Sequence, residues 1–227
     1  MAIRLLKKNM RWTCHHAHLD KSLLITPELL EQSNQHMQEK WYLMRELKKD
    51  YTEKKLYSRM KKTVDMIASQ GCKYIRTFVD VDNIVGLKCV EQAHRLKSVK
   101  KQDAVYIQLA TQPLEGLAGD DANIELFEKA ANICDIVGCL PSRDGKIGKW
   151  DEHMDIAFST AKRLNKPLEA HLDQLNTPNE NETERFCDFV EKYNYQGKAR
   201  SIHSISVACQ PLDKQKEISE RLRELDI

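Results

Sequence analysis

Alternation of strand-like and helix-like segments constrains this chain more than any other feature of its sequence. Short runs rich in β-branched and aromatic residues are followed by amphipathic segments, about six times along the chain, with connections of a few residues. Such alternation predicts parallel strands joined by crossover helices, in an open doubly wound sheet or a (β/α) barrel. A complete barrel needs eight units and typically about 250 residues. A chain of 227 residues would therefore stop about two units short.

The predicted elements follow from this periodicity and from the residues that end each segment. Thr26 and Pro27 are suited to the start of a helix, and Gly71 is suited to the end of one. The predicted strands cover residues 12–18, 72–80, 104–110, 133–140, 167–172 and 199–204. The predicted helices run from 26–28 to about 49 and over 53–70, 85–99, 122–132, 152–164, 181–193 and 212–225.

Composition narrows the function classes. The 36 Lys and Arg residues nearly balance 34 Asp and Glu residues, and basic residues are interspersed with acidic ones, which argues against a nucleic-acid binder and against a membrane-surface protein. Lysine pairs at 48–49, 61–62 and 100–101 are interpreted as solvated helix faces. No apolar run of about 18 residues is present, and residues 1–11 do not form a convincing signal peptide, so we expect a cytoplasmic protein.

Cysteine usage agrees with a reducing compartment. The seven cysteines are scattered and form no Cys-x-x-Cys pair. Cys134 and Cys139 are the closest pair, and both lie in or beside an apolar run. We therefore expect them to pack in the core as small hydrophobic residues rather than to bind a metal.

Histidines occur where the chemistry of a metal site would need them. On a strand over residues 12–18, His16 and His18 point to the same face, because side chains alternate with a period of two. Neutral imidazole is a common zinc ligand, and this spacing lets both rings reach one ion. A histidine-rich surface turn would give the same pattern, so the pair alone leaves both interpretations open.

Two further histidines strengthen the first interpretation. His171 and His203 lie at the carboxyl ends of the predicted fifth and sixth strands, the edge at which α/β barrels form their active sites. His36, His94 and His153 fall in predicted helices and are given no role.

The segments around these histidines resemble the amidohydrolase superfamily, and within it the cytosine deaminase-like branch. The similarity is colinear from Thr13 to about Pro211. The matching segments are His16-Ala17-His18-Leu19-Asp20-Lys21, Ile75-Arg76-Thr77-Phe78-Val79-Asp80-Val81, Gln112-Pro113-Leu114-Glu115-Gly116, Val137-Gly138-Cys139-Leu140-Pro141, His171-Leu172-Asp173 and His203.

The resemblance implies a metal-dependent hydrolase with a distorted (β/α) barrel, here an α/β chain that forms one partial domain over residues 1–227. It implies that His16, His18 and His171 ligate one divalent ion, zinc or iron, and that His203 lies near the metal. A metal-bound hydroxide would attack an electrophilic ring carbon, and a C–N bond would break.

Departures from the family pattern bear on the substrate and on proton transfer. A glutamate that shuttles protons in the family's deaminases is replaced by Gln174, whose amide does not titrate, so the shuttle would fall to His203, to Asp173 or to a group absent from this sequence. Leu114 stands where cytosine deaminase has a glutamine, with Gln112 two residues away. Histidines of cytosine deaminase are replaced as well, by Phe78 and Ser142.

These departures favour a small cyclic amide, amidine or N-substituted heterocycle over cytosine itself. Gln112 and Gln174 are candidate substrate-binding residues. Lys21 is a third candidate, which could contact an anionic or carbonyl group of the ligand, although a solvated lysine after a turn would look the same.

Family members also carry a β-sandwich built from both termini and an aspartate from an eighth strand, and neither is found in this sequence. We therefore expect a truncated form, whose barrel an oligomer or a second chain could complete. The alternative is a catalytically inactive fragment or degenerate paralogue that only binds a ligand or a partner.

Overall fold

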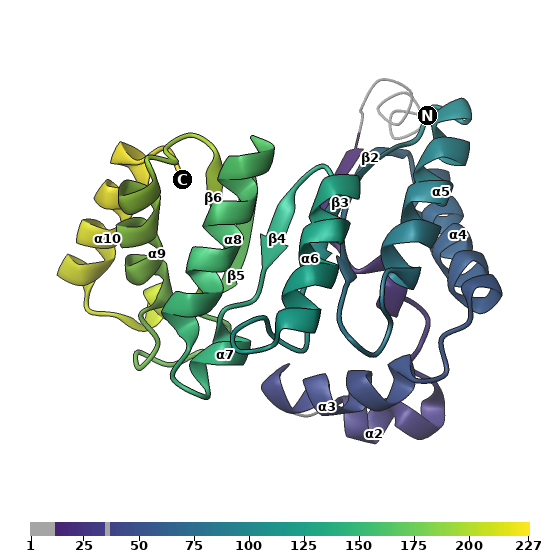
Figure 1. Ribbon diagram of the computed structural model, residues 1–227, viewed down its shortest axis with the longest axis horizontal. Coiled ribbons are helices and arrows are strands. Elements are labelled where there is room, and N and C mark those ends of the chain that lie inside the picture. The colour runs from purple at the N-terminus through teal and green to yellow at the C-terminus, as the bar shows by residue number, and fades with distance from the viewer. Residues whose placement is uncertain (1–11, 35–36) are drawn as a thin grey trace, which may run out of the picture. The chain divides into compact units, whose positions relative to one another are not determined.

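The chain divides into two compact units, residues 1–110 and 111–227 (Figure 1). The computed structural model describes residues 12–34 and 37–227. The interpretation of residues 1–11 as lacking a signal peptide, and the assignment of His36 to a helix, lie outside the described residues.

The first unit is organised around a parallel strand pair. β1 (Trp12–Ala17) pairs in parallel with β2 (Cys72–Asp80), and the sheet order is β1-β2-β3, with β3 (Tyr106–Gln112) beginning in this unit. Helices α4 (Glu53–Ser69) and α5 (Lys88–Gln102) contact β2 and each other. Their apolar stripes are buried, and the largest buried members are Leu56, Met60, Val64, Val90 and Leu96.

A β-bulge interrupts the pairing of β1 with β2. Cys14 pairs with Ile75 and Ala17 pairs with Thr77, so β1 advances three residues while β2 advances two. The extra residue changes which side chains share a face, because a shift of one residue along a strand moves every later side chain to the other side. Beyond the bulge, the residues that flank Ala17 therefore lie on the face of Phe78, opposite the side of Ile75 and Thr77.

The long helix predicted to run from 26–28 to about 49 is wrong. The described residues form a 3-10 turn, η2 (Pro27–Leu29), a short helix, α2 (Leu30–Ser33), and a separate helix, α3 (Met37–Lys48). Thr26 and Pro27 occupy the predicted start, but the Thr26 side chain makes no capping hydrogen bond. Asn34 ends α2, as expected from a residue that favours caps and turns over helix interiors.

The second unit contains a parallel sheet of order β4-β5-β6, formed by β4 (Val137–Cys139), β5 (Leu168–Leu172) and β6 (Ala199–His203). Its helices are α6 (Asp121–Ile133), α7 (Ser142–Gly145), α8 (Trp150–Leu164), α9 (Glu182–Tyr193) and α10 (Leu212–Glu224). Two further 3-10 turns are η1 (Leu19–Lys21) in the first unit and η3 (Ile205–Cys209) in the second. Figure 1 shows α8 and α9 alongside β5 and β6.

The predicted α/β fold with parallel strands is confirmed. Predicted elements recur in the structure with ends shifted by a few residues, while the short helix α7 and the 3-10 turns were not predicted. Cys134 and Cys139 are buried, as expected. Among the residues that the structure describes, no helix combines the length and the apolar character needed to cross a bilayer.

The interpretation of the lysine pairs as solvated is wrong for two residues. Lys48 is completely buried, and Lys100 is 6% exposed. Successive helix positions are about 100° apart, so the first lysine of each pair turns inward while Lys49 and Lys101 remain exposed. Carboxylates meet the two buried ammonium groups.

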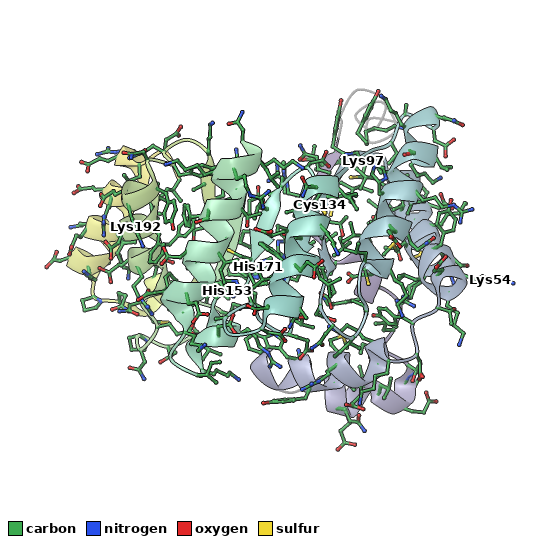
Figure 2. All side chains as sticks on the ribbon, in the orientation of Figure 1. Lys54, Lys97, Cys134, His153, His171 and Lys192 are labelled. Atoms are coloured by element: carbon green, nitrogen blue, oxygen red, sulfur yellow. The ribbon has the colours of Figure 1, made fainter. Side chains whose placement is uncertain are left out.

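An aromatic cluster holds the second unit together. The ring of Phe158 on α8 is fully buried, and its centroid lies 5.8 Å from Phe186, 6.0 Å from Phe189 and 5.1 Å from Tyr193. Figure 2 shows the side chains that fill the space around these helices. Aromatic pairs at such separations add to the stabilisation given by burial.

We expect Phe158→Ala to lower the free energy of unfolding by about 3–5 kcal/mol, because it removes a buried ring and leaves a cavity. Ile147, 65% exposed in the same unit, supplies the control: Ile147→Ala should change stability by less than about 0.5 kcal/mol. Urea titration followed by circular dichroism measures both values. Equal effects of the two substitutions would contradict the placement of Phe158.

Candidate metal centre and substrate residues

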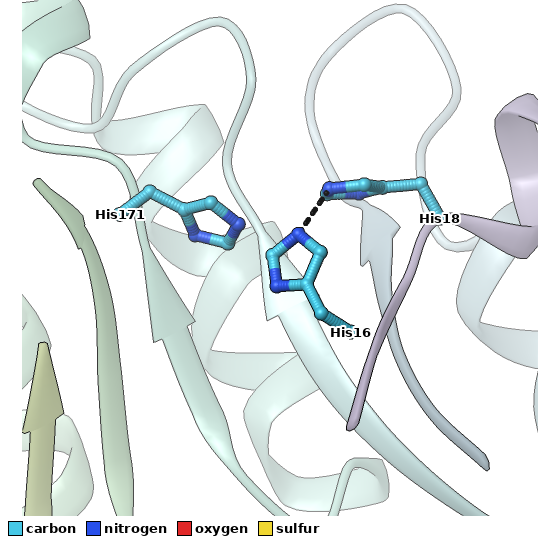
Figure 3. Close-up of side chains that lie close together, drawn as sticks. All are labelled: His16, His18 and His171. Atoms are coloured by element: carbon cyan, nitrogen blue, oxygen red, sulfur yellow. Dashed lines mark hydrogen bonds between the residues drawn. The ribbon is translucent and has the colours of Figure 1, made fainter. Parts of the chain in front are cut away.

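The first unit brings two predicted ligands together. The Nε2 atoms of His16 and His18 are 3.1 Å apart, and Figure 3 draws the hydrogen bond between them. Their ring centroids lie 5.0 Å and 5.9 Å from that of Phe78, which confirms that both rings lie on the face reached through the bulge. The predicted convergence of the two imidazoles is therefore present in the structure.

The separation of the two nitrogens suits a shared divalent ion. Two imidazole nitrogens bound to one tetrahedral zinc at about 2.0–2.1 Å lie about 3.3 Å from each other. The observed 3.1 Å needs only a small adjustment to reach this value. Imidazole nitrogen, the donor that both residues offer, is suited to zinc and to iron.

In the second unit, two predicted site residues lie at neighbouring strand ends. His171 belongs to β5 and is 2% exposed, and His203 is the last residue of β6. The backbone register pairs Leu172 with His203, and the ring centroids of His171 and His203 are 5.2 Å apart. His171 is drawn in Figure 3.

The backbone at these strand ends adopts an unusual conformation. Asp173 has a φ of 48°, His203 a φ of 74° and Ser204 a φ of 50°, in the left-handed region that non-glycine residues rarely occupy. Such residues cost about 1–3 kcal/mol each and cluster at functional sites. The strain at both strand ends thus agrees with a functional edge in this unit.

The protonation state of His203 follows from its surroundings. Although the residue is exposed, partial desolvation lowers the pKa of its imidazole below the ordinary value of 6.5. The ring is therefore neutral at pH 7 and able to accept a proton.

Both carboxylate oxygens of Asp173 accept hydrogen bonds from backbone amides at the start of α9. Its Oδ1 accepts a hydrogen bond from the Glu182 amide at 2.8 Å, and its Oδ2 accepts one from the Thr183 amide at 3.1 Å. In return, the Asp173 amide donates to the Glu182 carboxylate at 2.9 Å. This reciprocal arrangement resembles a capping box, in which a carboxylate stabilises the first turn of a helix.

Two glutamine side chains have buried atoms that need partners. Gln112, at the end of β3, is 3% exposed, and its Oε1 accepts no hydrogen bond from the described residues. Gln174 follows β5, and its buried Nε2 donates to none of them. An unsatisfied buried polar atom costs about 1–3 kcal/mol, so each is a candidate for ligand recognition.

Lys21 lies in the turn after His18, and its ammonium group is paired with carboxylates. Its ammonium is 2.5 Å from Asp80 Oδ1 and 3.9 Å from Asp20 Oδ2. Although burial opposes the charge, Asp20 and Asp80 raise the pKa of Lys21. Burial raises the pKa of Asp20 to about 6, against the lowering influence of Lys21.

Sequence reasoning missed the other charges around this turn. Lys48 contacts Asp82 at 2.5 Å and Asp80 at 3.3 Å, and all three side chains are completely buried. The sequence signal for this cluster was Asp80-Val81-Asp82, in which two acidic residues lie at the end of a buried strand. His153, predicted only as a packing or surface residue, is buried and hydrogen-bonded to Asp144 at 2.6 Å.

Comparison with known proteins identifies the class. No protein-family profile matches the chain. The fold superposes on 5-methylcytosine deaminase from Klebsiella pneumoniae liganded with phosphonocytosine, with a TM-score of 0.87 and 20% identity over 96% of this chain and 52% of that one. N-isopropylammelide isopropylaminohydrolase from Burkholderia multivorans gives a TM-score of 0.76 and 19% identity over 94% and 53%. The chain therefore shares the fold of these two hydrolases, in agreement with the predicted resemblance to the amidohydrolase superfamily.

Sequence comparison finds two further similar proteins. It is 32% identical over 214 residues to an uncharacterized protein of Haemophilus influenzae, covering 93% of this chain and 77% of that protein, and it belongs to the same family. It is also 24% identical over 208 residues to N-isopropylammelide isopropyl amidohydrolase of Pseudomonas sp., covering 86% and 49%. The chain spans about half the length of that enzyme and of the two solved structures.

The lowered pKa of His203 is measurable in the metal-free protein. We expect its imidazole C–H resonance, assigned with a His203→Gln variant, to titrate below 6.5 in the folded chain and near 6.5 in urea. Because the folded state binds this proton less well, His203 should reduce stability as pH falls from about 6.5 through the lowered pKa. A folded-state midpoint above 6.5 would contradict the desolvation of the ring.

Proposed function

We propose that this chain is part of a metal-dependent hydrolase that cleaves a non-peptide C–N bond of a small cyclic amide, amidine or N-heterocycle. The observation that carries the proposal is the His16 and His18 pair, whose Nε2 atoms converge to 3.1 Å at the end of β1. The names of similar proteins agree with it, since they describe a 5-methylcytosine deaminase and N-isopropylammelide hydrolases.

His16, His18 and His171 are the proposed ligands of one divalent ion, zinc or iron. Each lies at or next to the carboxyl end of a parallel strand, and each offers an imidazole nitrogen. A divalent ion held by three such ligands supplies a water that ionises near neutral pH.

His203 is the favoured proton acceptor. Its desolvated imidazole is neutral at pH 7, and its ring lies beside that of His171. Asp173, the other predicted catalytic residue, is less suited to this role because amide donors of α9 engage both of its oxygens. We assign Asp173 to holding the end of β5 against α9, which orients the neighbouring His171 and Gln174.

Substrate recognition is assigned to Gln112 and Gln174, with Lys21 as a third contact. Both amides have buried atoms that lack partners among the described residues, and a ring bearing adjacent N–H and C=O groups would satisfy them. A contact of Lys21 with the substrate would compete with its ion pair to Asp80. Lys21 is therefore the weakest of the three assignments.

The architecture proposed for the whole is an incomplete (β/α)8 barrel of about six β/α units, forming a single domain over residues 1–227. Support comes from the two parallel three-stranded sheets and from the overlap of 96% of the chain with the deaminase structure.

One observation favours the alternative of an inactive paralogue that only binds a ligand. Gln174 stands where a proton-shuttling glutamate is expected, and an amide neither takes up nor releases a proton near neutral pH. Metal binding and ligand binding would survive in such a protein, whereas turnover would not.

Metal content tests the proposed ligands. The wild-type chain should retain about one equivalent of zinc or iron after dialysis, measured by inductively coupled plasma mass spectrometry. His16→Ala and His171→Ala should lose most of it, because each removes one of three ligands. His94→Ala is the matched control, since this exposed histidine of α5 should leave the content unchanged. Equal metal content in wild type and His171→Ala would count decisively against the site.

Ammonia release from pyrimidines, triazines and cyclic ureas tests the reaction. Turnover above a metal-free control excludes the inactive alternative. Gln174→Glu should raise the rate by about 10²-fold or more, within the range that positioned acid–base groups contribute. Gln102→Glu, on the exposed end of α5, is the control for added charge. Loss of metal-dependent turnover from every substrate, in wild type and in Gln174→Glu, would support the inactive paralogue.

A further inference from the structure

Lys48 of the first unit occupies a position that costs free energy, because its charge is removed from water. The ammonium group of this α3 residue is fully buried and lies 2.5 Å from Asp82 Oδ2 and 3.3 Å from Asp80 Oδ2. Asp82 also ties down the following loop, because its Oδ1 accepts hydrogen bonds from the amides of Ile84 and Val85 at 3.0 and 3.1 Å. Lys48 thus joins α3 to the end of β2 through two carboxylates.

Stability alone does not account for such a cluster. Removing an ion from water costs several kcal/mol, and replacing a buried ion pair with apolar or neutral groups of similar volume is often neutral or stabilising. The cluster also contains one more carboxylate than ammonium groups, because Asp20, Asp80 and Asp82 are matched by Lys21 and Lys48. A role in holding geometry explains its retention better than a role in raising stability.

The contacts of Asp80 lead directly to the turn after His18. Its backbone amide donates to Asp20 Oδ2 at 2.9 Å, and its Oδ1 receives the Lys21 ammonium. Asp20 and Lys21 belong to η1, which begins one residue after His18. An unbroken series of contacts therefore runs from Lys48 through Asp80 to this turn.

Other groups fix the backbone of the same turn. The Leu19 amide donates to Thr77 Oγ1 of β2 at 3.0 Å, and the Asp20 carbonyl accepts from the Tyr51 hydroxyl at 3.0 Å and from Arg59. The turn is thus held from β2, from α4 and from the segment before α4. Lys48, on α3, reaches this turn through Asp80.

We propose that Lys48 is a positioning residue for the metal centre: by holding Asp80, it fixes the η1 turn and keeps the imidazole of His18 convergent with that of His16. This inference rests on the proposed metal-binding function. It extends the site to a lysine of α3 that touches neither the ion nor the substrate. Partners that orient metal ligands from behind typically contribute 10–100-fold to metal affinity.

The test separates positioning from stability. In Lys48→Met/Asp82→Asn, one positive and one negative charge are removed together, so no buried charge loses its only partner. We expect this variant to unfold within a few degrees of the wild-type temperature yet to bind Zn²⁺ about 10-fold or more weakly, measured by competition with a chromophoric chelator. With Co²⁺ in place of Zn²⁺, its visible absorption bands should shift, because they report the ligand geometry.

Lys100→Met is the matched control. Lys100 is also a buried lysine of the first unit between two carboxylates, at 2.5 Å from Asp65 and 2.8 Å from Asp103, and neither of these partners belongs to η1. Its substitution should leave the Zn²⁺ affinity and the Co²⁺ spectrum unchanged. An equal loss of affinity in Lys100→Met would overturn the specific role of Lys48.

Failure of this inference and failure of the metal proposal give different results. Wild-type affinity and an unchanged Co²⁺ spectrum in a folded double variant overturn the role of Lys48 and leave the metal site intact. If the double variant does not fold, the single substitution Lys48→Gln carries the test, because it removes the ion pair with Asp80 while keeping a polar side chain, and wild-type affinity in that variant overturns the inference. A wild-type chain that binds no Zn²⁺ refutes the metal site itself.

Discussion

The parallel ladder between β1 and β2 is the interaction on which the candidate site depends. β1 supplies His16 and leads directly into His18, and at least two of the groups that hold the following turn, Thr77 and Asp80, belong to β2. A short edge strand has little of its own to fix its direction, because only one of its sides is paired. The ladder fixes the direction of β1 along its length, and the buried ion cluster fixes the turn beyond its end.

The two units carry chemically different functional groups. In the first unit, paired imidazoles are backed by a cluster of five buried or partly buried charges. In the second unit, an imidazole with a lowered pKa and a buried imidazole lie at strand ends whose backbone is strained. The first unit therefore carries paired imidazole donors, whereas the second carries an imidazole that can exchange protons and two glutamine amides with buried atoms that lack partners among the described residues.

Periodicity predicted most of the fold, because parallel strands buried on both faces and amphipathic helices leave strong patterns in a sequence. The convergence of His16 and His18 was predicted for the same reason. The break near Asn34 was missed, since a helix that is polar on most sides gives little contrast to mark its end. The burial of Lys48 was missed because its partners lie more than thirty residues away in Asp80 and Asp82. Long-range charge pairing has no periodic signature.

Residue roles were harder to predict than residue positions. Asp173 lies where the sequence placed it, but its hydrogen bonds to α9 depend on how that helix meets the end of β5. Similarly, the lowered pKa of His203 depends on its desolvation and not on its neighbours in the sequence. Such properties arise only when the strand ends are assembled.

The extra residue in β1 has a consequence for how this strand can change over time. Without it, strict alternation from the Thr13 and Tyr74 pair would turn His16 and His18 toward the side of Ile75 and Thr77, where α4 and α5 pack. Loss of a single codon between Cys14 and Ala17 would thus remove both imidazoles from their common face while leaving their identity intact. In this segment, the number of residues therefore matters to the site as much as their chemistry does.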